Sequence, residues 1–339
     1  MPPPVKGWRE LASHFYAKHI KGVPKPPPVS PATAAFLSVL FTVIYVAPFY
    51  LSAATRPSPQ LTRDAPSSIR ARIRAVTFSC IVSVLLTVYV LYQFGNVSPA
   101  DIFLLLGLWP VSLMDTARTM LLVVILFAGP LFENGIVDGE LKGWIKGRGL
   151  YESLSSWMGY RNYVVGPVSE ELIWRSLIIP LHVLARFSGK RIIFLTPLYF
   201  GIAHLHHLYE FRLTNPRTPL LLAVLRSLFQ FTYTSLFGFF AAFVFLRTGN
   251  VYSTILVHSF CNWMGLPRFW GRVGVEPGEP IGPVGVRQGS EDKDRLQGKG
   301  IMWTVAYYAI LVAGAIGFYW QLFPLTESTH GLPVVLIEE

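Results

Sequence analysis

Long apolar segments follow one another along most of the 339-residue chain. A helix that crosses about 30 Å of hydrocarbon needs roughly 20 residues, because each residue adds about 1.5 Å to its length. The pattern therefore predicts an all-α, polytopic membrane protein of about eight transmembrane helices. The candidate spans lie near residues 32–54, 74–94, 114–132, 163–187, 191–208, 219–246, 251–266 and 301–323.

The polar segments between these spans divide the chain into parts of different character. We expect a Pro-rich tail at 1–30, an amino-terminal transmembrane anchor at 31–160, a transmembrane core with the candidate catalytic residues at 161–266, a flexible polar loop at 267–300, and a final transmembrane helix with a tail at 301–339. Residues 101–112 are too short to span a bilayer and predict a re-entrant or interfacial helix. Residues 133–160 predict a loop with an amphipathic helix at the headgroup level.

The composition agrees with a membrane location and limits the partners. The chain is 52% hydrophobic and 14% charged, with a mean hydropathy of +0.44, a balance that one water-soluble core could not accommodate. The formal charge of +10 is spread over the tail and two loops, without the aromatic-interleaved basic groove that favours nucleic acid. We therefore expect membrane lipid and carboxylate-bearing substrates as partners, and no nucleic acid. Charge does not settle the orientation of the termini, because one helix separates two basic segments.

Ionisable side chains within the apolar spans need an explanation, because each costs about 2.5–3.5 kcal/mol at the middle of a membrane helix. In GPVSEELIWR (166–175), Glu170 and Glu171 point about 100° apart on a helix and cannot do the same work. Glu171 and Arg175 stand at i and i+4 and predict an ion pair, which leaves Glu170 as the candidate base. The alternative is that all three form a neutralised network that holds helices together.

Histidines mark the second polar segment, FGIAHLHH (200–207). His204 follows Phe200 by one turn, and His206 and His207 stand near the expected water interface. A single histidine in a helix is more often a packed, hydrogen-bonded residue than a catalytic one, so this segment alone leaves both interpretations open. The roles of His206 and His207 do not follow from the sequence.

The third polar segment is HSFCN (258–262), in which His258 and Asn262 share one face of an apolar helix. Two donors side by side could hydrogen-bond one substrate oxygen, or they could bond to each other and serve helix packing. Together the three segments supply a base, a histidine and an oxyanion-binding pair. Hydrolysis of a carbonyl by activated water requires that set.

The three segments also stand in a familiar order. They carry EExxxR at Glu170, Glu171 and Arg175, FxxxH at Phe200 and His204, and HxxxN at His258 and Asn262. The set resembles the motifs of the type II CAAX prenyl endopeptidases, the Ras and a-factor converting enzyme group of the CPBP family of intramembrane glutamate proteases. The stretches RNYVVGPVSEELIWR, FGIAHLHH and HSFCNWMG are similar to the eukaryotic branch in particular. The resemblance covers roughly residues 160–266.

This resemblance implies a multi-pass enzyme of the endoplasmic reticulum membrane with an intramembrane catalytic cavity. It would remove the last three residues of prenylated CaaX proteins, such as Ras-like GTPases and lipidated peptide precursors, by cutting after the lipid-bearing cysteine. The family mechanism makes Glu170 the base that activates water and gives His204 the task of binding that water. His258 and Asn262 would then stabilise the tetrahedral oxyanion.

The other two residues of the EExxxR motif, Glu171 and Arg175, would position the first of these helices, and Arg175 could also meet the substrate carboxylate. A catalytic zinc is the rival chemistry, since Glu170, His204 and His258 could form a His₂Glu ligand set. The chain has no HExxH helix, and the resembled family works through glutamate. We therefore expect no metal and no cofactor.

Two other classes of function remain open at this stage. In a non-catalytic CPBP-type scaffold or chaperone, the polar side chains would only pair across helices. In an ion-coupled transporter they would form a relay, although the chain shows no inverted repeat. The intact set of three motifs favours the enzyme, and the phenylalanines of 219–246 could line a groove for the prenyl chain.

Overall fold

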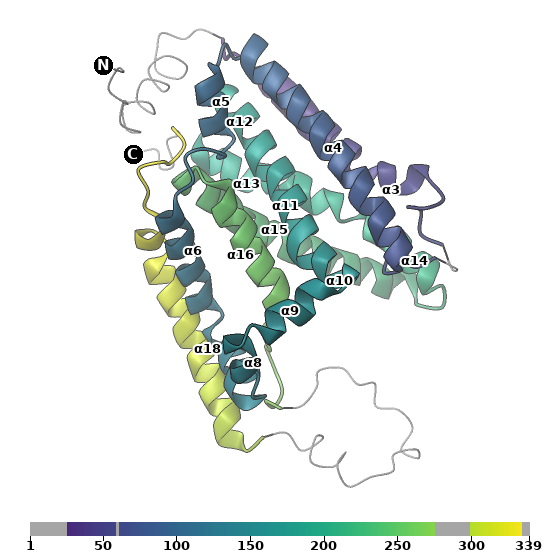
Figure 1. Ribbon diagram of the computed structural model, residues 1–339, viewed down its shortest axis with the longest axis vertical. Coiled ribbons are helices and arrows are strands. Elements are labelled where there is room, and N and C mark those ends of the chain that lie inside the picture. The colour runs from purple at the N-terminus through teal and green to yellow at the C-terminus, as the bar shows by residue number, and fades with distance from the viewer. Residues whose placement is uncertain (1–25, 59–60, 275–298, 334–339) are drawn as a thin grey trace.

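The computed structural model describes residues 26–58, 61–274 and 299–333, and every regular element within these ranges is a helix (Figure 1). The predicted all-α class is therefore confirmed. The predicted tail lies mostly outside the described residues, as does most of the polar loop at 267–300.

The helices fall into two groups along the chain. The first comprises α2 (Pro31–Val46), α3 (Pro48–Leu51), α4 (Pro66–Gln93), α5 (Pro99–Leu105), α6 (Leu113–Leu126), α7 (Ala128–Phe132), the π-helical η1 (Glu133–Val137), α8 (Leu141–Ile145), α9 (Arg148–Ser155) and α10 (Trp157–Tyr160). The second comprises the π-helical η2 (Arg161–Val165), α11 (Gly166–Glu171), the π-helical η3 (Leu172–Leu177), α12 (Ile178–Leu184), α13 (Gly189–Ala203), α14 (His206–Thr214), α15 (Leu220–Thr248), α16 (Val251–Met264), α18 (Ile301–Gln321) and the 3₁₀ turn η4 (Pro324–Thr326).

Local sequence explains where many of these helices begin and end. Ser30, Ser98 and Ser188 each accept a hydrogen bond from a backbone N–H in the first turn of the next helix. Gly249 takes a left-handed conformation (φ 54°) and ends α15, and Asn250 caps α16 directly after it. This short link places α15 and α16 next to each other.

The expectation of eight spans is not confirmed. Among the described residues, four helices are long and apolar enough to cross a membrane, namely Pro31–Leu51, Pro66–Gln93, Leu220–Thr248 and Ile301–Gln321. A fifth would be Leu113–Leu126 with Ala128–Val137, which bend by 76° relative to each other. The three expected spans that carry the polar motifs form shorter or interrupted helices instead.

Prolines account for much of that interruption. The π-helical turns η2 and η3 each lie about one turn before a proline, Pro167 and Pro180 respectively. A proline ring clashes with the carbonyl four residues earlier and cannot donate to it, so a widened turn relieves the clash. Hydropathy counts apolar residues and does not register such breaks.

The segments 101–112 and 133–160 were predicted to form a short helix and a loop with an amphipathic helix. The segment 101–112, predicted to form a short, non-spanning helix, overlaps the seven-residue α5, which begins at Pro99. The segment 133–160 is more helical than the expected loop, because η1, α8, α9 and α10 follow one another through it. Its polar side chains and exposed apolar residues such as Leu150 and Tyr151 agree with the amphipathic character expected there.

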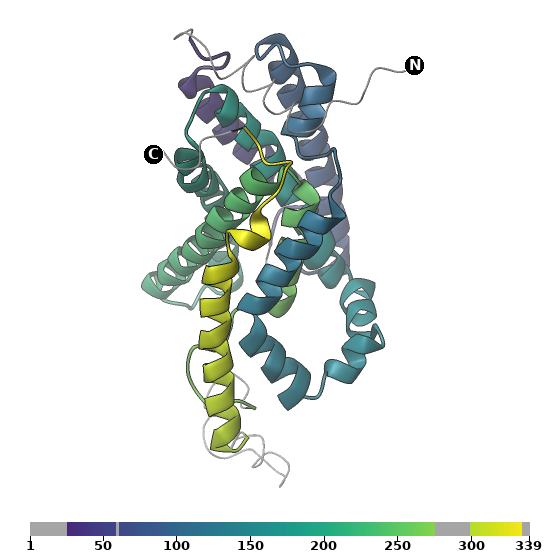
Figure 2. The same cartoon turned by 90° about the vertical axis from the view of Figure 1, so that its left-hand side faces the viewer.

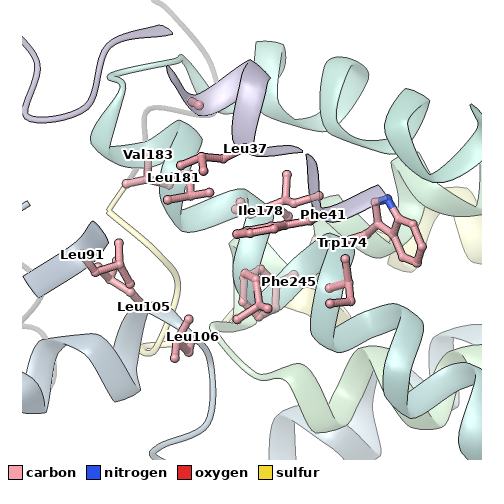
Figure 3. Packing of buried hydrophobic residues seen from close by; sticks show 14 of the residues in the cluster. Leu37, Phe41, Leu91, Leu105, Leu106, Trp174, Ile178, Leu181, Val183 and Phe245 are labelled. Atoms are coloured by element: carbon pink, nitrogen blue, oxygen red, sulfur yellow. The ribbon is translucent and has the colours of Figure 1, made fainter. Parts of the chain in front are cut away.

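One apolar core joins the amino-terminal helices to the polar-motif helices. Phe41 of α2, Ile178 of α12 and Phe245 of α15 are fully buried and lie close together in this core (Figure 3). Leu105 and Leu106, at the end of α5, pack into the same cluster. The short helix α5 therefore helps to support the helices that carry the polar motifs.

At the other side of the molecule, α18 runs along α6 and α7 (Figure 2). The most extensive helix contact is that between α13 and α15. Gly238 on α15 permits the close approach, since a Cβ atom at this position would stand only 2.6 Å from Cβ of Pro197 on α13. This packing holds the histidine-bearing α13 against the long helix α15.

Gly238→Val should therefore destabilise the fold. Overpacking a close helix contact costs about 1–3 kcal/mol, because the added methyl groups push α13 away from α15. The matched control is Gly143→Val on α8, where the nearest atom to a Cβ is a carboxylate oxygen of Glu140 at 3.6 Å. Thermal unfolding of the detergent-solubilised variants measures the difference, and equal melting temperatures for the two would show that the α13–α15 contact tolerates the added volume.

Candidate active site

A cavity of about 800 Å³ opens between the polar-motif helices. Its wall includes Glu170 of α11, His204 at the end of α13, and His258 and Asn262 of α16. The structure therefore brings together the four residues that the sequence predicted to be catalytic. A volume of this size suits a ligand rather than a few trapped waters.

The two adjacent glutamates differ as their helical spacing predicted. The Glu170 side chain is 21% exposed and lines the cavity, with Oε2 3.7 Å from Nε2 of His258. The Glu171 side chain is fully buried, and its Oε1 accepts hydrogen bonds from Nη1 of Arg175 at 3.0 Å and from Nδ1 of His258 at 2.7 Å. His258 thus lies between a cavity carboxylate and a buried one.

Arg175 does not reach the cavity. Its side chain is only 1% exposed, and the guanidinium stacks over the rings of Phe200 and Phe237 at 4.8 and 5.5 Å. The ion pair predicted between Glu171 and Arg175 is present, but a buried guanidinium cannot meet a substrate carboxylate. The substrate-binding role expected for Arg175 is therefore not compatible with its position.

Backbone hydrogen bonding orients His204. Its Nδ1 donates to the carbonyl oxygen of Phe200 at 2.9 Å, one turn earlier, and the Phe200 ring stands edge-on to the imidazole at 4.6 Å. This explains the FxxxH spacing, since one residue supplies both the acceptor and the packing surface. With the proton on Nδ1, Nε2 remains an acceptor for a molecule in the cavity.

Asn262 is held by a residue that sequence reasoning missed. Its Nδ2 donates to the backbone carbonyl of Asn162, on the π-helical turn before α11, at 3.0 Å. An amide NH₂ group carries two hydrogens, so one remains for the cavity. Because the acceptor is a main-chain oxygen, no side-chain pattern could have indicated it.

The amino-terminal part of the chain also contributes to the site. Tyr45 of α2 shares a hydrogen bond of 2.9 Å with Ser169, next to Glu170, and packs edge-on against Trp174 at 4.9 Å. Tyr45 lines the cavity, as does Phe237 of α15, whose ring lies 4.6 Å from that of His258. Neither residue belongs to a polar motif. Phe237 is one of the phenylalanines of 219–246 expected to line a groove, whereas no pattern in the sequence indicated a role for Tyr45.

A second polar cluster stands beside the first, on α14. His206, His207 and Glu210 offer ligand atoms that lie within 4.8 Å of one another, the one such group of three among the described residues. Glu210 is already engaged with Arg72 at 2.7 Å and with Nδ1 of His207 at 2.9 Å. The set considered for catalytic zinc does not gather in this way.

The geometry defines a class of protein. A cavity among apolar helices that gathers a carboxylate, two imidazoles and an amide has the parts of an intramembrane hydrolase that works by activated water. The buried ion pair behind the cavity fixes one of the imidazoles.

Comparison with known proteins shows the family to which the chain is similar. A family model described as type II CAAX prenyl endopeptidase Rce1-like matches residues 152–264. The chain is 38% identical over 240 residues to a probable CAAX prenyl protease 2 of Schizosaccharomyces pombe, an alignment that covers 70% of this chain and 83% of the relative. It is 32% identical over 253 residues to CAAX prenyl protease 2 of Homo sapiens, covering 70% and 74%. It is 27% identical over 311 residues to that of Saccharomyces cerevisiae, covering 84% and 93%.

No solved structure matches the chain significantly. The chain belongs to the type II CAAX prenyl endopeptidase family, as its motifs predicted. The predicted activity, that of a CAAX prenyl protease, is confirmed at the level of the family.

Substitutions in the Glu171–Arg175 pair can test whether Glu171 orients His258. Glu171→Gln should cost about 3–5 kcal/mol of stability, because it leaves the buried Arg175 guanidinium without its counter-charge. The double variant Glu171→Gln/Arg175→Gln removes both charges and should recover most of that loss. Its kcat should nevertheless stay about 10²-fold low with little change in KM, because His258 has lost the carboxylate that orients it.

Thermal unfolding and steady-state kinetics on the two variants separate the effects. Glu152→Gln, an exposed change on α9, is the matched control and should alter neither. A double variant with the wild-type kcat would show that Glu171 serves only to neutralise Arg175.

Proposed function

We propose that this protein removes the C-terminal tripeptide of prenylated CaaX proteins by a glutamate-activated water. The observation that carries the proposal is the convergence of Glu170, His204, His258 and Asn262 on one cavity, with His258 Nε2 3.7 Å from Glu170 Oε2. These residues come from separate segments of the chain, so a purely local packing role for each is the less economical explanation.

Glu170 and His204 would prepare the nucleophile. Both line the cavity, and both present an acceptor to it: the Glu170 carboxylate, and Nε2 of His204, whose Nδ1 is committed to Phe200. A water bound between them could give one proton to Glu170 and attack the scissile carbonyl carbon. The proton would then pass to the leaving amine as the carbon–nitrogen bond breaks.

His258 and Asn262 would stabilise the oxyanion that forms during the attack. The hydrogen bond from Nδ1 of His258 to Glu171 occupies that nitrogen, so His258 can donate from Nε2 only as an imidazolium. Asn262 adds the amide hydrogen that Asn162 does not use.

The lipid would occupy the apolar wall of the cavity. This wall is formed by residues of α6, α15 and α18 and of the link after α6, namely Val123, Leu126, Phe127, Leu236, Phe240 and Phe318. The expected aromatic groove is thus supported only in part. Of the phenylalanines in 219–246, Phe245 is buried in the core, and Phe229 is exposed and is not among the residues that line the cavity.

The substrates we propose are membrane-anchored prenylated proteins, including Ras-like GTPases and lipidated peptide precursors. Their own lipid would bring them to a cavity among membrane helices, so the peptide needs few additional contacts. The site of action we propose is the endoplasmic reticulum membrane, in line with the multi-pass character of the chain.

Glu170→Gln should abolish cleavage of a farnesylated CaaX peptide by the purified protein. The glutamine keeps the volume of the side chain and loses the base, so the variant should unfold at the wild-type temperature. The exposed Glu152→Gln again serves as the control with full activity. Turnover near wild type in Glu170→Gln would exclude Glu170 as the base.

Removal of metal should leave the rate within about twofold, since a carboxylate and an imidazole generate the nucleophile without a cation. The measurement is cleavage after prolonged treatment with a strong chelator, with metal content checked by elemental analysis. Loss of activity that equimolar zinc restores would point instead to a zinc enzyme with Glu170, His204 and His258 as ligands.

A further inference from the structure

The cavity carries a cluster of positive charge that the proposed reaction does not use. Arg63, Arg72 and Arg161 all line it, and we call these three the cationic wall. Figure 1 places α14 and α3, beside this wall, at the right, and α6 and α18, which carry part of the apolar wall, at the left; α11 and α16 lie between. The helices that supply the apolar wall and those beside the cationic wall therefore lie on opposite sides of α11 and α16, which carry the proposed catalytic residues.

The charges around the cationic wall do not cancel. The three guanidinium groups are linked by ionic contacts to two carboxylates, Asp64 and Glu210, which leaves one positive charge in excess among the described residues. Neither Asp64 nor Glu210 is among the residues that line the cavity, whereas Arg63, Arg72 and Arg161 are. The arrangement therefore presents a net positive face that matches a single anionic group.

Within the cationic wall, Arg72 and Arg161 are already committed. Arg72 donates to Glu210 at 2.7 Å and to the backbone carbonyl of Thr55 at 2.9 Å. Arg161 donates to Asp64 at 2.8 Å and to the carbonyl of Arg63 at 3.2 Å. These bonds fix the wall and leave Arg63 as the residue with donors to offer.

The side chain of Arg63 is 41% exposed, and its contacts among the described residues are weak. It stands 3.6 Å from a carboxylate oxygen of Glu210 and 3.7 Å from one of Asp64, both beyond hydrogen-bond distance. It also lies 3.3 Å from Nδ1 of His207. That nitrogen must carry a proton to bond Glu210, so it cannot accept from Arg63 at the same time.

The protonation states of Glu210 and His207 prevent His207 from accepting a hydrogen bond from Arg63. Burial acts to raise the pKa of Glu210, but the hydrogen bond from His207 and the charge of Arg72 outweigh it and lower the pKa to about 2. Burial lowers the pKa of His207, which therefore favours its neutral form. Glu210 then remains an acceptor, and His207 keeps its single proton on Nδ1.

The position of Arg63 suits the length of the leaving group. An extended tripeptide is roughly 10 Å long, at about 3.3–3.6 Å per residue. Arg63 contacts His207 at 3.3 Å, and the His207 ring lies 5.8 Å from the ring of His204. Arg63 therefore stands within about one tripeptide of the proposed water-binding histidine.

We propose that Arg63 binds the C-terminal carboxylate of the aaX tripeptide and so sets the distance between the end of the substrate and the scissile bond. The proposal rests on the proposed protease function. It takes over the task first considered for Arg175, which is buried. A guanidinium suits this task because its planar fork can hold both oxygens of a carboxylate.

A metal ion is a less favourable occupant of the cavity beside the cationic wall. The group formed by His206, His207 and Glu210 has suitable spacing, but the Glu210 carboxylate is 2.7 Å from the Arg72 guanidinium. A cation would have to displace that guanidinium and would then stand beside three positive charges. A substrate carboxylate meets no such repulsion.

The test compares a farnesylated CaaX peptide that ends in a free carboxylate with the same peptide ending in a carboxamide, using the full-length protein in detergent. The wild-type protein should prefer the carboxylate by about 10- to 100-fold in kcat/KM, the range expected for charge-assisted hydrogen bonds. Arg63→Gln should reduce this preference to near unity, mainly by raising KM for the carboxylate peptide. The carboxamide peptide should be cleaved equally by both proteins.

Arg56→Gln is the matched control, because Arg56 lies in the same loop, is exposed and bonds only the carbonyl of Tyr50 among the described residues. It should keep the full preference. Equal cleavage of the two peptides by the wild-type protein would overturn the proposal whether or not Arg63→Gln folds, as would an undiminished preference in that variant. Failure of the underlying function looks different, because neither peptide would then be cleaved, or Glu170→Gln would remain active.

Discussion

The active site depends on one buried interaction, the shared hydrogen bonding of Glu171 to Arg175 and His258. A carboxylate and a guanidinium with almost no exposure are stable together only because each satisfies the charge of the other. The same carboxylate oxygen that accepts from Arg175 also orients His258, which in turn faces Glu170. Glu170, the proposed base, therefore faces a histidine that is held in place by Glu171, which does not line the cavity.

In the proposed binding mode, the order of the groups that line the cavity matches the order of chemical groups along the substrate. A prenylated CaaX terminus consists of a lipid, then the scissile amide, then a short peptide with a free carboxylate. The structure offers an apolar wall from α6, α15 and α18, then the residues of α11 and α16, and then the arginines near α14. A site of this kind can position the substrate by binding its lipid and its terminal carboxylate, so the side chains between these two ends need few specific contacts.

The sequence predicted the site residues better than the architecture. The separation of Glu170 from Glu171 and the common face of His258 and Asn262 follow from helical periodicity alone, and both are present in the structure. The contributions of Asn162 and Tyr45 could not be predicted, because one acts through its backbone and the other comes from a helix more than a hundred residues away. The sequence also did not distinguish the arginines of the cationic wall from other basic loop residues, because only the fold shows that they line the cavity.

The π-helical turns around α11 made the helix boundaries hard to predict, and they also affect the orientation of the two glutamates. The helix that carries both glutamates is bounded by π-helical turns, each before a proline. Such a turn inserts one extra residue with little additional rise along the helix axis. The following residues are therefore rotated about the axis, and their side chains point in a different direction than in a regular α-helix. Glu171 and Arg175 still meet at 3.0 Å although a widened turn runs between them. The same breaks that shorten the expected spans therefore help to set where Glu170 and Glu171 point.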